Sequence, residues 1–313
     1  MRIFLAGATG ALGRRLLPML VDAGHDVVGT TRSAGKMADL AAAGAEPVVM
    51  DGLDAESVAR AVTAARPDVV IHQLTSLSKV GNLKKFDEEF AETNQLRTTG
   101  TDHLLAAART VGTKRFIAQS YTGWPNERAG RAVKNETDPL DPHPTTPSRQ
   151  TLAAIAYIED TVPAAPGLDG LALRYGTFYG SGTGLTAGGD LLEMVRKRKL
   201  PVVGGGAGVW SMIHIDDAAR ATVRAIERGD PGVYNIVDDE PAPVSEWLPY
   251  LARTIGAKPP MRLPAWLAKP IIGEHGVSVM TQIRGSSNEK AKRELGWQPA
   301  YRSWREGFRS GLS

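Results

Sequence analysis

Short apolar runs alternate with amphipathic stretches along the first two-thirds of the chain. The runs expected to form strands are Arg2–Ala6, Asp26–Thr31, Glu46–Met50, Val69–His72, Arg115–Ser120 and Gly170–Tyr175, with one more at Gly232–Asp238. The stretches expected to form helices are Leu12–Ala23, Ser33–Ala43, Ala55–Ala65, Asp87–Val111 and Thr151–Thr161. Such alternation is typical of parallel strands joined by crossover helices. The pattern therefore predicts an α/β fold with a doubly wound parallel sheet.

Proline and glycine mark the places where this alternation is interrupted. Pro18 lies inside the first helical stretch and removes one backbone hydrogen bond, so we expect a kink there without a helix end. The proline-rich segment Asp138–Pro147 cannot form sheet and is expected to be a loop on the wall of a cleft. Two glycine-rich segments, Gly180–Gly189 and Gly204–Gly208, are consistent with loops over a site.

Beyond residue 175 the alternation becomes less regular. From Pro241 onward, short helices, prolines and the tryptophans Trp247, Trp266 and Trp297 indicate a smaller lobe packed across the strand ends. The sequence therefore predicts two interleaved parts. Residues 1–175 plus 209–238 form a dinucleotide-binding domain, and residues 176–208 plus 239–313 form a substrate-binding lobe.

The most informative motif is Gly7-x-x-Gly10-x-x-Gly13, which lies between the first expected strand and the first expected helix. Glycine lets the backbone turn sharply, come close to a pyrophosphate and pack the helix tightly on the sheet. The unpaired N–H groups and the positive dipole end of that helix then face the phosphate charge. Because the motif has the strand–turn–helix context that dinucleotide binding requires, we predict a dinucleotide site here.

Composition narrows the class of protein without naming its chemistry. The 313 residues are 42% hydrophobic and 23% charged, as in an ordinary globular protein. The basic and acidic side chains are interspersed and give a formal net charge of +3, unlike a nucleic-acid-binding tail. The absence of cysteine excludes disulfides, thiolate catalysis and zinc–thiolate sites, and the histidine spacing gives no metal-ligand cluster. With a strand expected from residue 2 and no apolar stretch of spanning length, we expect a cytoplasmic protein that binds neither membrane nor nucleic acid.

Five further segments accompany the glycine motif, namely Pro67–His72, Asn94, Arg174–Gly180, Met212–Asp217 and Ser287–Trp297. Together they resemble the extended short-chain dehydrogenase/reductases, the group of nucleotide-sugar epimerases and dehydratases. The resemblance covers nearly the whole chain and implies a Rossmann lobe of seven strands with a C-terminal substrate lobe. It also implies that Asp216 and Asp217 are mainly architectural. A small-molecule substrate and a homodimer are expected.

The chain departs from this family at its catalytic pair, Tyr-x-x-x-Lys. Aligning Thr151-Leu-Ala-Ala154 with the family's Lys-Leu-Ala-Ala places Thr151 at the lysine position and Pro147 at the tyrosine position. No Tyr-x-x-x-Lys occurs anywhere in the sequence. The pair normally supplies a phenol, its pKa lowered by the ammonium group, that exchanges a proton during hydride transfer. The sequence is thus an atypical member, and proton transfer by the usual acid is not available to it.

Other side chains could carry the chemistry. Ser120, Tyr121 and Thr122 follow the fifth expected strand, near the place where the family keeps a catalytic hydroxyl. Tyr121 could donate a proton to a substrate oxygen, or it could stack against cofactor or substrate. Ser120 and Thr122 could orient the substrate. His143, in the proline-rich loop, is the histidine freest to face a substrate.

The end of the second expected strand bears on the choice of nucleotide. NAD-preferring proteins place a carboxylate there for the ribose hydroxyls, whereas the first acid here is Asp39, inside the next helix. Arg32 and Lys36 could bind a 2′-phosphate through charge-assisted hydrogen bonds. We therefore predict that NADP(H) is favoured over NAD(H). The other residues assigned to the cofactor are Gly7, Thr9, Gly10, Ala11, Leu12, Gly13, Asp51, Gly52, Leu53, Leu74, Thr75, Asn94, Gln119 and Tyr175.

Three functions remain open at this point. The leading hypothesis is an NADP(H)-dependent oxidoreductase that acts on a small or medium organic substrate. The second is an epimerase, isomerase or lyase that retains its nucleotide. The third is a non-catalytic NADP(H)-sensing protein, which the missing pair favours and the full C-terminal lobe disfavours.

Overall fold

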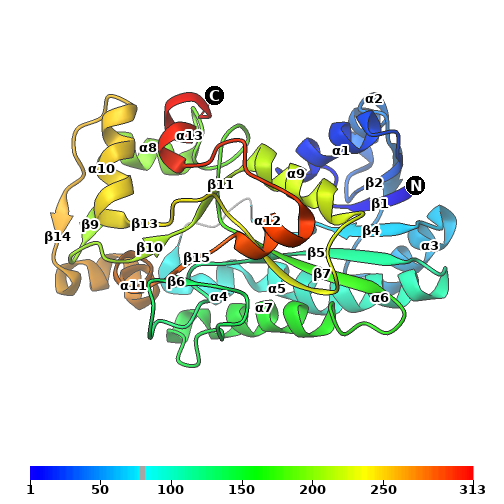
Figure 1. Ribbon diagram of the computed structural model, residues 1–313, viewed down its shortest axis with the longest axis horizontal. Coiled ribbons are helices and arrows are strands. Elements are labelled where there is room, and N and C mark those ends of the chain that lie inside the picture. Colours follow the sequence, from blue (N-terminus) through cyan, green and yellow to red (C-terminus); the bar gives the residue numbers. More distant parts are fainter. Residues whose placement is uncertain (78–81, 313) are drawn as a thin grey trace.

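The computed structural model describes residues 1–77 and 82–312, and its centre is a sheet of seven parallel strands (Figure 1). The strand order is β12-β7-β5-β4-β1-β2-β3, so the chain reverses direction across the sheet between β1 and β4. The strands are β1 (Arg2–Ala6), β2 (Asp26–Thr31), β3 (Glu46–Val49), β4 (Val69–His72), β5 (Arg115–Tyr121), β7 (Asp169–Tyr175) and β12 (Gly232–Ile236). The predicted doubly wound α/β fold is confirmed. In such sheets the reversal point opens a crevice for ligands at the carboxyl ends of the strands.

Helices cover both faces of this sheet, which is why its strands are apolar on both sides. On one face, α1 (Gly13–Asp22) packs beside α9 (Ile215–Ala225), and α1 continues through Pro18 as expected. On the other face lie α3 (Ala55–Ala65), α6 (Thr101–Thr110) and α7 (Arg149–Thr161). In Figure 1, α6 and α7 run below the sheet. Each face has its own buried cluster of aliphatic and aromatic side chains.

The helix predicted over Asp87–Val111 is interrupted, so the prediction of one continuous element was wrong. The chain forms α4 (Phe86–Glu89) and α5 (Ala91–Gln95), then one π-helical turn at Leu96–Gly100, and only then α6. Thr98 Oγ1 donates to the carbonyl of Asn94, and such side-chain bonds compete with the backbone ladder. A π-turn widens the helix by one residue and changes which side chains face inward. The helix expected over Ser33–Ala43 likewise divides into a 3₁₀ turn (Ala34–Lys36) and α2 (Met37–Ala42).

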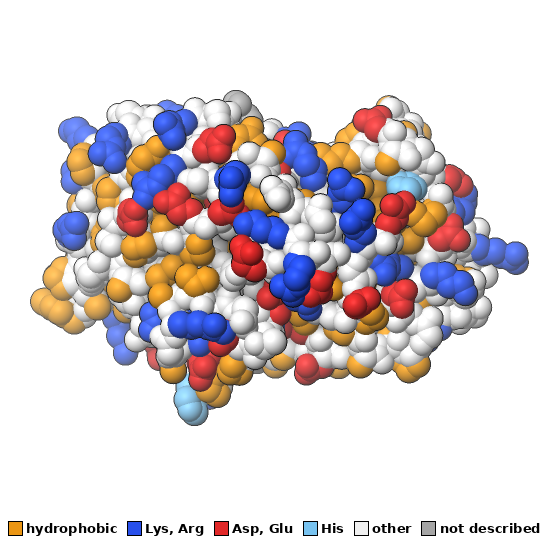
Figure 2. All heavy atoms as spheres, viewed as in Figure 1, with side chains coloured by type: hydrophobic (Ala, Val, Ile, Leu, Met, Phe, Trp, Pro, Cys, Tyr) orange, Lys and Arg blue, Asp and Glu red, His pale blue; other side chains and the backbone are white. Residues whose placement is uncertain are grey.

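A second body of packed helices lies beyond the sheet, at the left of Figure 1. Its core contains Trp247 and Trp304, both fully buried, whereas Trp266 is 73% exposed and does not pack as the sequence suggested. The helices of this body are α8 (Asp190–Arg196), α10 (Val244–Thr254), α11 (Ala265–Thr281) and α13 (Trp304–Ser310), with 3₁₀ turns at Leu83–Lys85 and Thr146–Ser148. By contrast, α12 (Glu289–Leu295) packs against β12 and α9, and Trp297 is buried in the cluster on that face of the sheet, so the assignment of Trp297 to the smaller lobe was wrong. Charged side chains of both signs are spread over the face of the molecule seen in Figure 2. The domain division given above remains a prediction.

Short strand pairs join distant segments around this body. They are β8 (Thr177–Tyr179) with β11 (Met212–His214), β9 (Val202–Val203) with β14 (Arg262–Leu263), β10 (Val209–Trp210) with β13 (Ala242–Pro243), and β6 (Val133–Lys134) with β15 (Gly285–Ser286). The proline-rich loop is not free of sheet pairing, because Leu140 forms an antiparallel bridge with Asn126. No helix within the described ranges has the length and apolar character to cross a membrane.

A buried carboxylate ties the C-terminal segment to the helix after β11. Asp217 is fully buried on α9, and its oxygens accept the backbone N–H groups of Ala300 and Tyr301 at 2.9 Å each. Arg220 donates to the same carboxylate at 2.6 Å, and the Trp297 indole donates to the Asp217 carbonyl. Asp217 is thus an architectural residue.

Candidate active site

A cleft of about 610 Å³ opens at the carboxyl ends of β1, β2 and β4, where the sheet reverses. Eleven residues assigned to the cofactor from the sequence line it: Gly7, Thr9, Gly10, Ala11, Leu12, Gly13, Arg32, Lys36, Leu74, Thr75 and Gln119. Residues not predicted from the sequence also line it, namely Thr30, Thr31, Met50, Gln73, Ser76, Leu77, Phe178, Gly182, Thr183 and Gly184. Gln73 directly follows β4, so the rule that ligands meet strand ends would have found it. Gly182, Thr183 and Gly184 belong to the glycine-rich segment 180–189, which was expected to lie over a site.

The three glycines of the motif meet different surroundings. Gly7 has φ +94°, and a Cβ there would lie 2.7 Å from the Gln73 carbonyl oxygen. A Cβ on Gly13 would lie 2.2 Å from the Gly7 carbonyl oxygen. At Gly10 a Cβ would meet only the Gly7 oxygen, at 3.3 Å, so its other side faces open space in the cleft. A larger side chain at Gly10 would fill that space, as expected of a cradle for a ligand.

The start of α1 provides hydrogen-bond donors at the same place. Leu12 is the N-cap residue and offers no side-chain bond to the first turn. The first amides of a helix lack intrahelical acceptors and carry the positive end of the helix dipole. With the glycine turn in front of them, these amides fit a pyrophosphate group.

Five residues assigned to the cofactor do not line the cleft. Asp51 accepts the backbone N–H of Leu53 through Oδ1, so its carboxylate closes its own loop with Gly52. Asn94 Nδ2 donates to Thr151 Oγ1 at 3.0 Å. The Tyr175 hydroxyl is buried between Thr222 (2.7 Å) and Gln73 (3.3 Å). It therefore lies within the core.

The four catalytic candidates separate in the structure. Ser120 points to the α7 side of the sheet and donates to Glu159 Oε1 at 2.6 Å, while Thr122 bonds with Ser286 in a buried position. His143 is exposed in the proline-rich loop and is not among the residues that line the cleft. Tyr121 shares the strand face of Gln119, which lines the cleft, because side chains alternate along β5.

The Tyr121 hydroxyl shares a 3.0 Å hydrogen bond with Thr177 Oγ1, next to the cleft residue Phe178. Burial raises the pKa of Tyr121 above its usual value, and the charge of Arg97 lowers it in part. The phenol is therefore protonated at neutral pH and is available as a donor. Tyr121 is itself not among the residues that line the cleft, but of the four candidates it is the one on the strand face of a cleft residue.

The comparisons with known proteins place the chain in a family. The family model described as the NAD dependent epimerase/dehydratase family matches residues 3–237. The chain belongs to this family. A 3-diazoavenalumate denitrifying reductase from a Streptomyces species is 44% identical over 311 residues, covering 98% of this chain and 99% of the relative. A 2-alkyl-3-oxoalkanoate reductase from Stenotrophomonas maltophilia is 30% identical, covering 82% of this chain and 76% of the relative.

Solved structures of the epimerase/dehydratase family share the fold. A UDP-glucose 4-epimerase from Thermotoga maritima, solved with UDP-glucose, has a TM-score of 0.76 at 24% identity and covers 100% of this chain and 97% of its own. A human epimerase family protein solved with NADPH has a TM-score of 0.77 at 18% identity, with coverages of 100% and 99%. The protein is thus an NAD(P)-dependent enzyme of the oxidoreductase or epimerase type.

Thr151 stands where the epimerase/dehydratase family has the lysine of its catalytic pair, and its side chain is a neutral hydroxyl that is already hydrogen-bonded. Thr151 is fully buried at the start of α7, and its Oγ1 donates to Asp87 Oδ1 at 2.7 Å. The Thr151 backbone N–H donates to the same carboxylate oxygen at 2.8 Å. Pro147 lies one turn earlier, in a 3₁₀ turn, and has no proton to give. This end of α7 is therefore a helix cap closed by Asp87 and Asn94.

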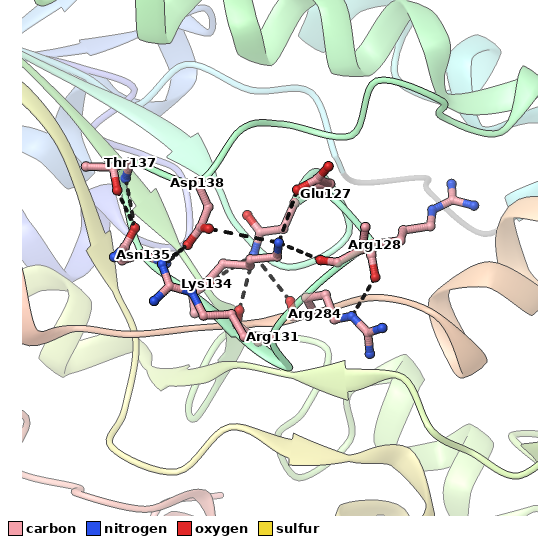
Figure 3. A network of polar contacts seen from close by, with 12 residues as sticks. Glu127, Arg128, Arg131, Lys134, Asn135, Thr137, Asp138 and Arg284 are labelled. Carbon is pink, nitrogen blue, oxygen red and sulfur yellow. Dashed lines mark hydrogen bonds and ion pairs between the residues drawn. The ribbon is translucent and has the colours of Figure 1, made fainter.

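Among the described residues, Lys134 is the lysine that is buried, but it cannot take the role of the missing family lysine (Figure 3). Its Nζ donates to the Ala129 carbonyl at 2.7 Å and pairs with Glu127 at 3.3 Å, while Asp138 lies 4.0 Å away. The dashed lines in Figure 3 show that the Lys134 ammonium group is surrounded by these oxygen atoms from one segment of the chain. Lys134 therefore holds the segment after β5 together. Among the described residues, no group of three or more His, Asp or Glu side chains could hold a metal ion.

We expect the substitution Thr151→Ala to lower turnover by less than tenfold, which corresponds to less than about 1.4 kcal/mol of activation free energy. The reason is that, among the described residues, the Thr151 hydroxyl forms hydrogen bonds to Asp87 and Asn94 and to no other side chain. Steady-state kinetics with saturating nucleotide would measure it. A thousandfold loss would show that Thr151 performs an essential part of the family lysine's role.

Proposed function

We propose that the protein is an NADPH-dependent reductase that removes the nitrogen of a diazo substrate as N2. Two observations support this. The relative that covers 98% of the chain at 44% identity is named as a denitrifying reductase of a diazo compound. The position that the family uses for its proton-transfer lysine carries the capped, neutral Thr151. The second observation carries the proposal, because it concerns the chemistry that the site can perform.

The chemical requirement differs between carbonyl and diazo reduction. A carbonyl oxygen becomes an alkoxide as hydride adds to its carbon, so each turnover needs an acid in contact with that oxygen. A diazonium group is already cationic, and hydride can add to its terminal nitrogen without an acid. The steps are R–N2⁺ + H⁻ → R–N=N–H and then R–N=N–H → R–H + N2. Atoms and charge balance: in the second step a base such as water takes the N–H proton, the C–N bond breaks with loss of N2, and the same proton is returned to the carbon. The protein needs mainly to position the reactants.

The residues of the cleft fit this task. Bound NADPH would supply the hydride. The glycine turn and the start of α1 would hold its pyrophosphate, as the space at Gly10 indicates. Phe178 and Gln119 line the same cleft farther along the sheet, beside Tyr121. We propose these residues as the boundary between the nucleotide and the substrate.

The cleft also supports the preference for NADPH. Arg32 and Lys36 both line it just after β2, and the chain itself has no acidic residue between the end of this strand and Asp39. In this structure Arg32 pairs with Glu92 on α5, and Glu92 also accepts a 2.7 Å bond from Ser76. The guanidinium of this lining residue is therefore held by a carboxylate of α5. A 2′-phosphate would compete with Glu92 for it.

We expect Arg32→Ala to weaken NADPH binding at least tenfold, with less than a twofold change for NADH, since charge-assisted bonds to the 2′-phosphate contribute about 1.5–3 kcal/mol. Fluorescence titration of both nucleotides measures this. Arg60→Ala, on the exposed face of α3, is the matched control. Unchanged NADPH affinity in Arg32→Ala would contradict the assignment.

The proposed activity is tested with 4-carboxybenzenediazonium and NADPH. The expected result is enzyme-dependent loss of NADPH absorbance with equimolar benzoate and N2. Gly10→Val protein serves as the control for the uncatalysed reaction. Tyr121→Phe should raise KM and keep kcat within about tenfold, whereas a carbonyl-reducing enzyme that uses Tyr121 as its acid would lose about a hundred- to ten-thousandfold in kcat.

Two other outcomes would overturn the proposal. Solvent-deuterium incorporation into a sugar nucleotide without net change of nucleotide would identify an epimerase that retains its cofactor. Nucleotide binding without turnover of any diazo or carbonyl substrate would identify a sensing protein.

The domain division and the homodimer expected from the sequence belong to the same proposal. Sedimentation analysis tests whether the protein is a homodimer.

A further inference from the structure

Arg97 is a buried cation, and two of its guanidinium nitrogens have no hydrogen-bond partner among the residues that the structure describes. It lies in the π-helical turn Leu96–Gly100 and is 5% exposed. Its Cζ lies 6.0 Å from the ring centroid of Phe90. Its Nε and Nη1 atoms are buried and have no hydrogen-bond partner among the described residues. Unpaired buried donors of a charged group are costly, so their retention calls for an explanation.

The nearest carboxylate does not serve as the counter-ion of Arg97. Glu159 on α7 interacts with Arg97 electrostatically, but its two oxygens already accept Arg174 Nε at 2.7 Å and Nη2 at 2.6 Å. Ser120 adds a third bond to the same carboxylate. Burial lowers the pKa of Arg97 to about 10, which leaves the guanidinium charged at neutral pH. The group of Arg97, Arg174 and Glu159 therefore has one positive charge in excess.

Tyr121 is the side chain that relates this excess charge to the cleft residues, although neither Tyr121 nor Arg97 lines the cleft itself. Tyr121 interacts electrostatically with Arg97, and its strand face is that of the cleft residue Gln119. Its neighbour Thr177 precedes Phe178 on β8, and Phe178 lines the cleft. The phenol is a donor at neutral pH, so the group that it can meet in the cleft is an acceptor. A cation behind a donor strengthens its bond to a negatively charged acceptor.

We infer that Tyr121 and Arg97 form a site for a negatively charged oxygen of the substrate, with the phenol in contact and the guanidinium behind it. The inference deepens the proposed function and rests on it: the substrate carries an anionic oxygen, carboxylate or aryl oxide, besides its diazo group. Arg97 is a positioning residue, because it acts through Tyr121. The π-turn explains why it can do so, since the extra residue turns this side chain inward toward the strand ends.

The test uses 4-nitrophenol, whose ionised form is coloured, and needs neither NADPH oxidation nor a diazo compound. Spectrophotometric pH titration of the bound probe in the protein loaded with NADP⁺ should give an ionisation constant at least tenfold larger than in water. Arg97→Gln should abolish this change, and Arg97→Lys should retain most of it. Tyr121→Phe should weaken binding of the ionised probe. Tyr157→Phe should not, because the Tyr157 hydroxyl on α7 donates to Asp102 on α6 at an exposed position.

A second arm measures the affinity of 4-nitrobenzoate in the same variants. If only the affinity for 4-nitrobenzoate depends on Arg97, the site binds a carboxylate. If only the ionisation constant of bound 4-nitrophenol depends on Arg97, the site binds an aryl oxide. Two results overturn the inference. The first is that Arg97→Gln changes neither the ionisation constant of bound 4-nitrophenol nor the affinity for 4-nitrobenzoate. The second is that neither probe binds to the parent protein. If the thermal transition shows that Arg97→Gln does not fold, the inference is tested with Tyr121→Phe and Arg97→Lys, for which the expected results are those given above. If the probes behave as expected but no diazo compound is reduced, the anion site stands and the proposed reaction fails.

Discussion

Replacement of Gly10 by valine is expected to abolish binding of both NADPH and NADH while the protein still folds. A Cβ at this position meets only the Gly7 carbonyl oxygen at 3.3 Å, so the local backbone needs a shift of a few tenths of an ångström. The remaining methyl groups of valine would enter the space in front of α1 where the pyrophosphate is expected. Fluorescence titration should show at least a hundredfold loss of affinity, with a thermal transition near that of the parent protein.

Gly13→Val provides the contrast that shows whether the effect is local. Its Cβ would lie 2.2 Å from the Gly7 oxygen and 2.8 Å from Ala8 backbone atoms, both part of the β1–α1 turn. This contact cannot relax by moving a side chain, so the variant should lose cooperative unfolding or melt far below the parent. Nucleotide binding by a folded Gly10→Val protein would show that the cleft is not the pyrophosphate site.

The second large effect is a steep loss of stability in acid. His72 and His275 are both buried, and desolvation lowers the pKa of each from 6.5 to about 4. His72 accepts the Leu74 N–H at Nδ1 and bonds the Leu96 carbonyl through Nε2, while His275 bonds Thr145 and touches Phe86 and Trp124. Each ring is therefore neutral when folded.

Between pH 6.5 and 4 the unfolded chain binds protons at these two positions and the folded protein does not, so stability falls as pH falls. The free energy of unfolding should decrease by up to about 2.7 kcal/mol per pH unit, and by about 3 kcal/mol for each histidine over the whole interval. Asp238 acts in the opposite direction, because burial raises the pKa of its carboxyl. Urea unfolding at a series of pH values measures the sum.

His275→Gln should remove about half of this pH dependence, and His143→Gln, at an exposed position, should leave it unchanged. An equal slope in His275→Gln and the parent protein would contradict the assignment of the effect to this ring. Well above pH 6.5 both rings are neutral in both states, so their contribution to the pH dependence disappears there.

The sequence predicted the sheet well because its strands are short apolar runs bounded by turn residues. β1, β2 and β4 begin and end at the expected residues, and β5 and β7 differ by one residue at one end. The glycine motif placed the cleft correctly, since a strand–turn–helix unit has few alternative geometries. These features depend on local patterns that a single sequence displays.

The candidate chemistry was harder to predict because it depends on which face each side chain takes. Ser120 and Thr122 flank Tyr121 in sequence, yet strand alternation and the turn after β5 direct them away from the cleft residue Gln119, to Glu159 and Ser286. Arg97 was missed for a different reason. A regular helix period gives no sign of the π-turn that turns it inward, and no local pattern announces one.

The carboxylate of Asp217 has a consequence for the order in which the chain matures during synthesis. α9 covers the sheet from residues 215–225, but the backbone N–H groups that satisfy Asp217 belong to residues 300 and 301. Until those residues leave the ribosome, burial of α9 would leave this charge with Arg220 alone. The nascent sheet therefore stays incompletely covered on its α1 side for some 75 residues of translation, during which its apolar surface is open to chaperones.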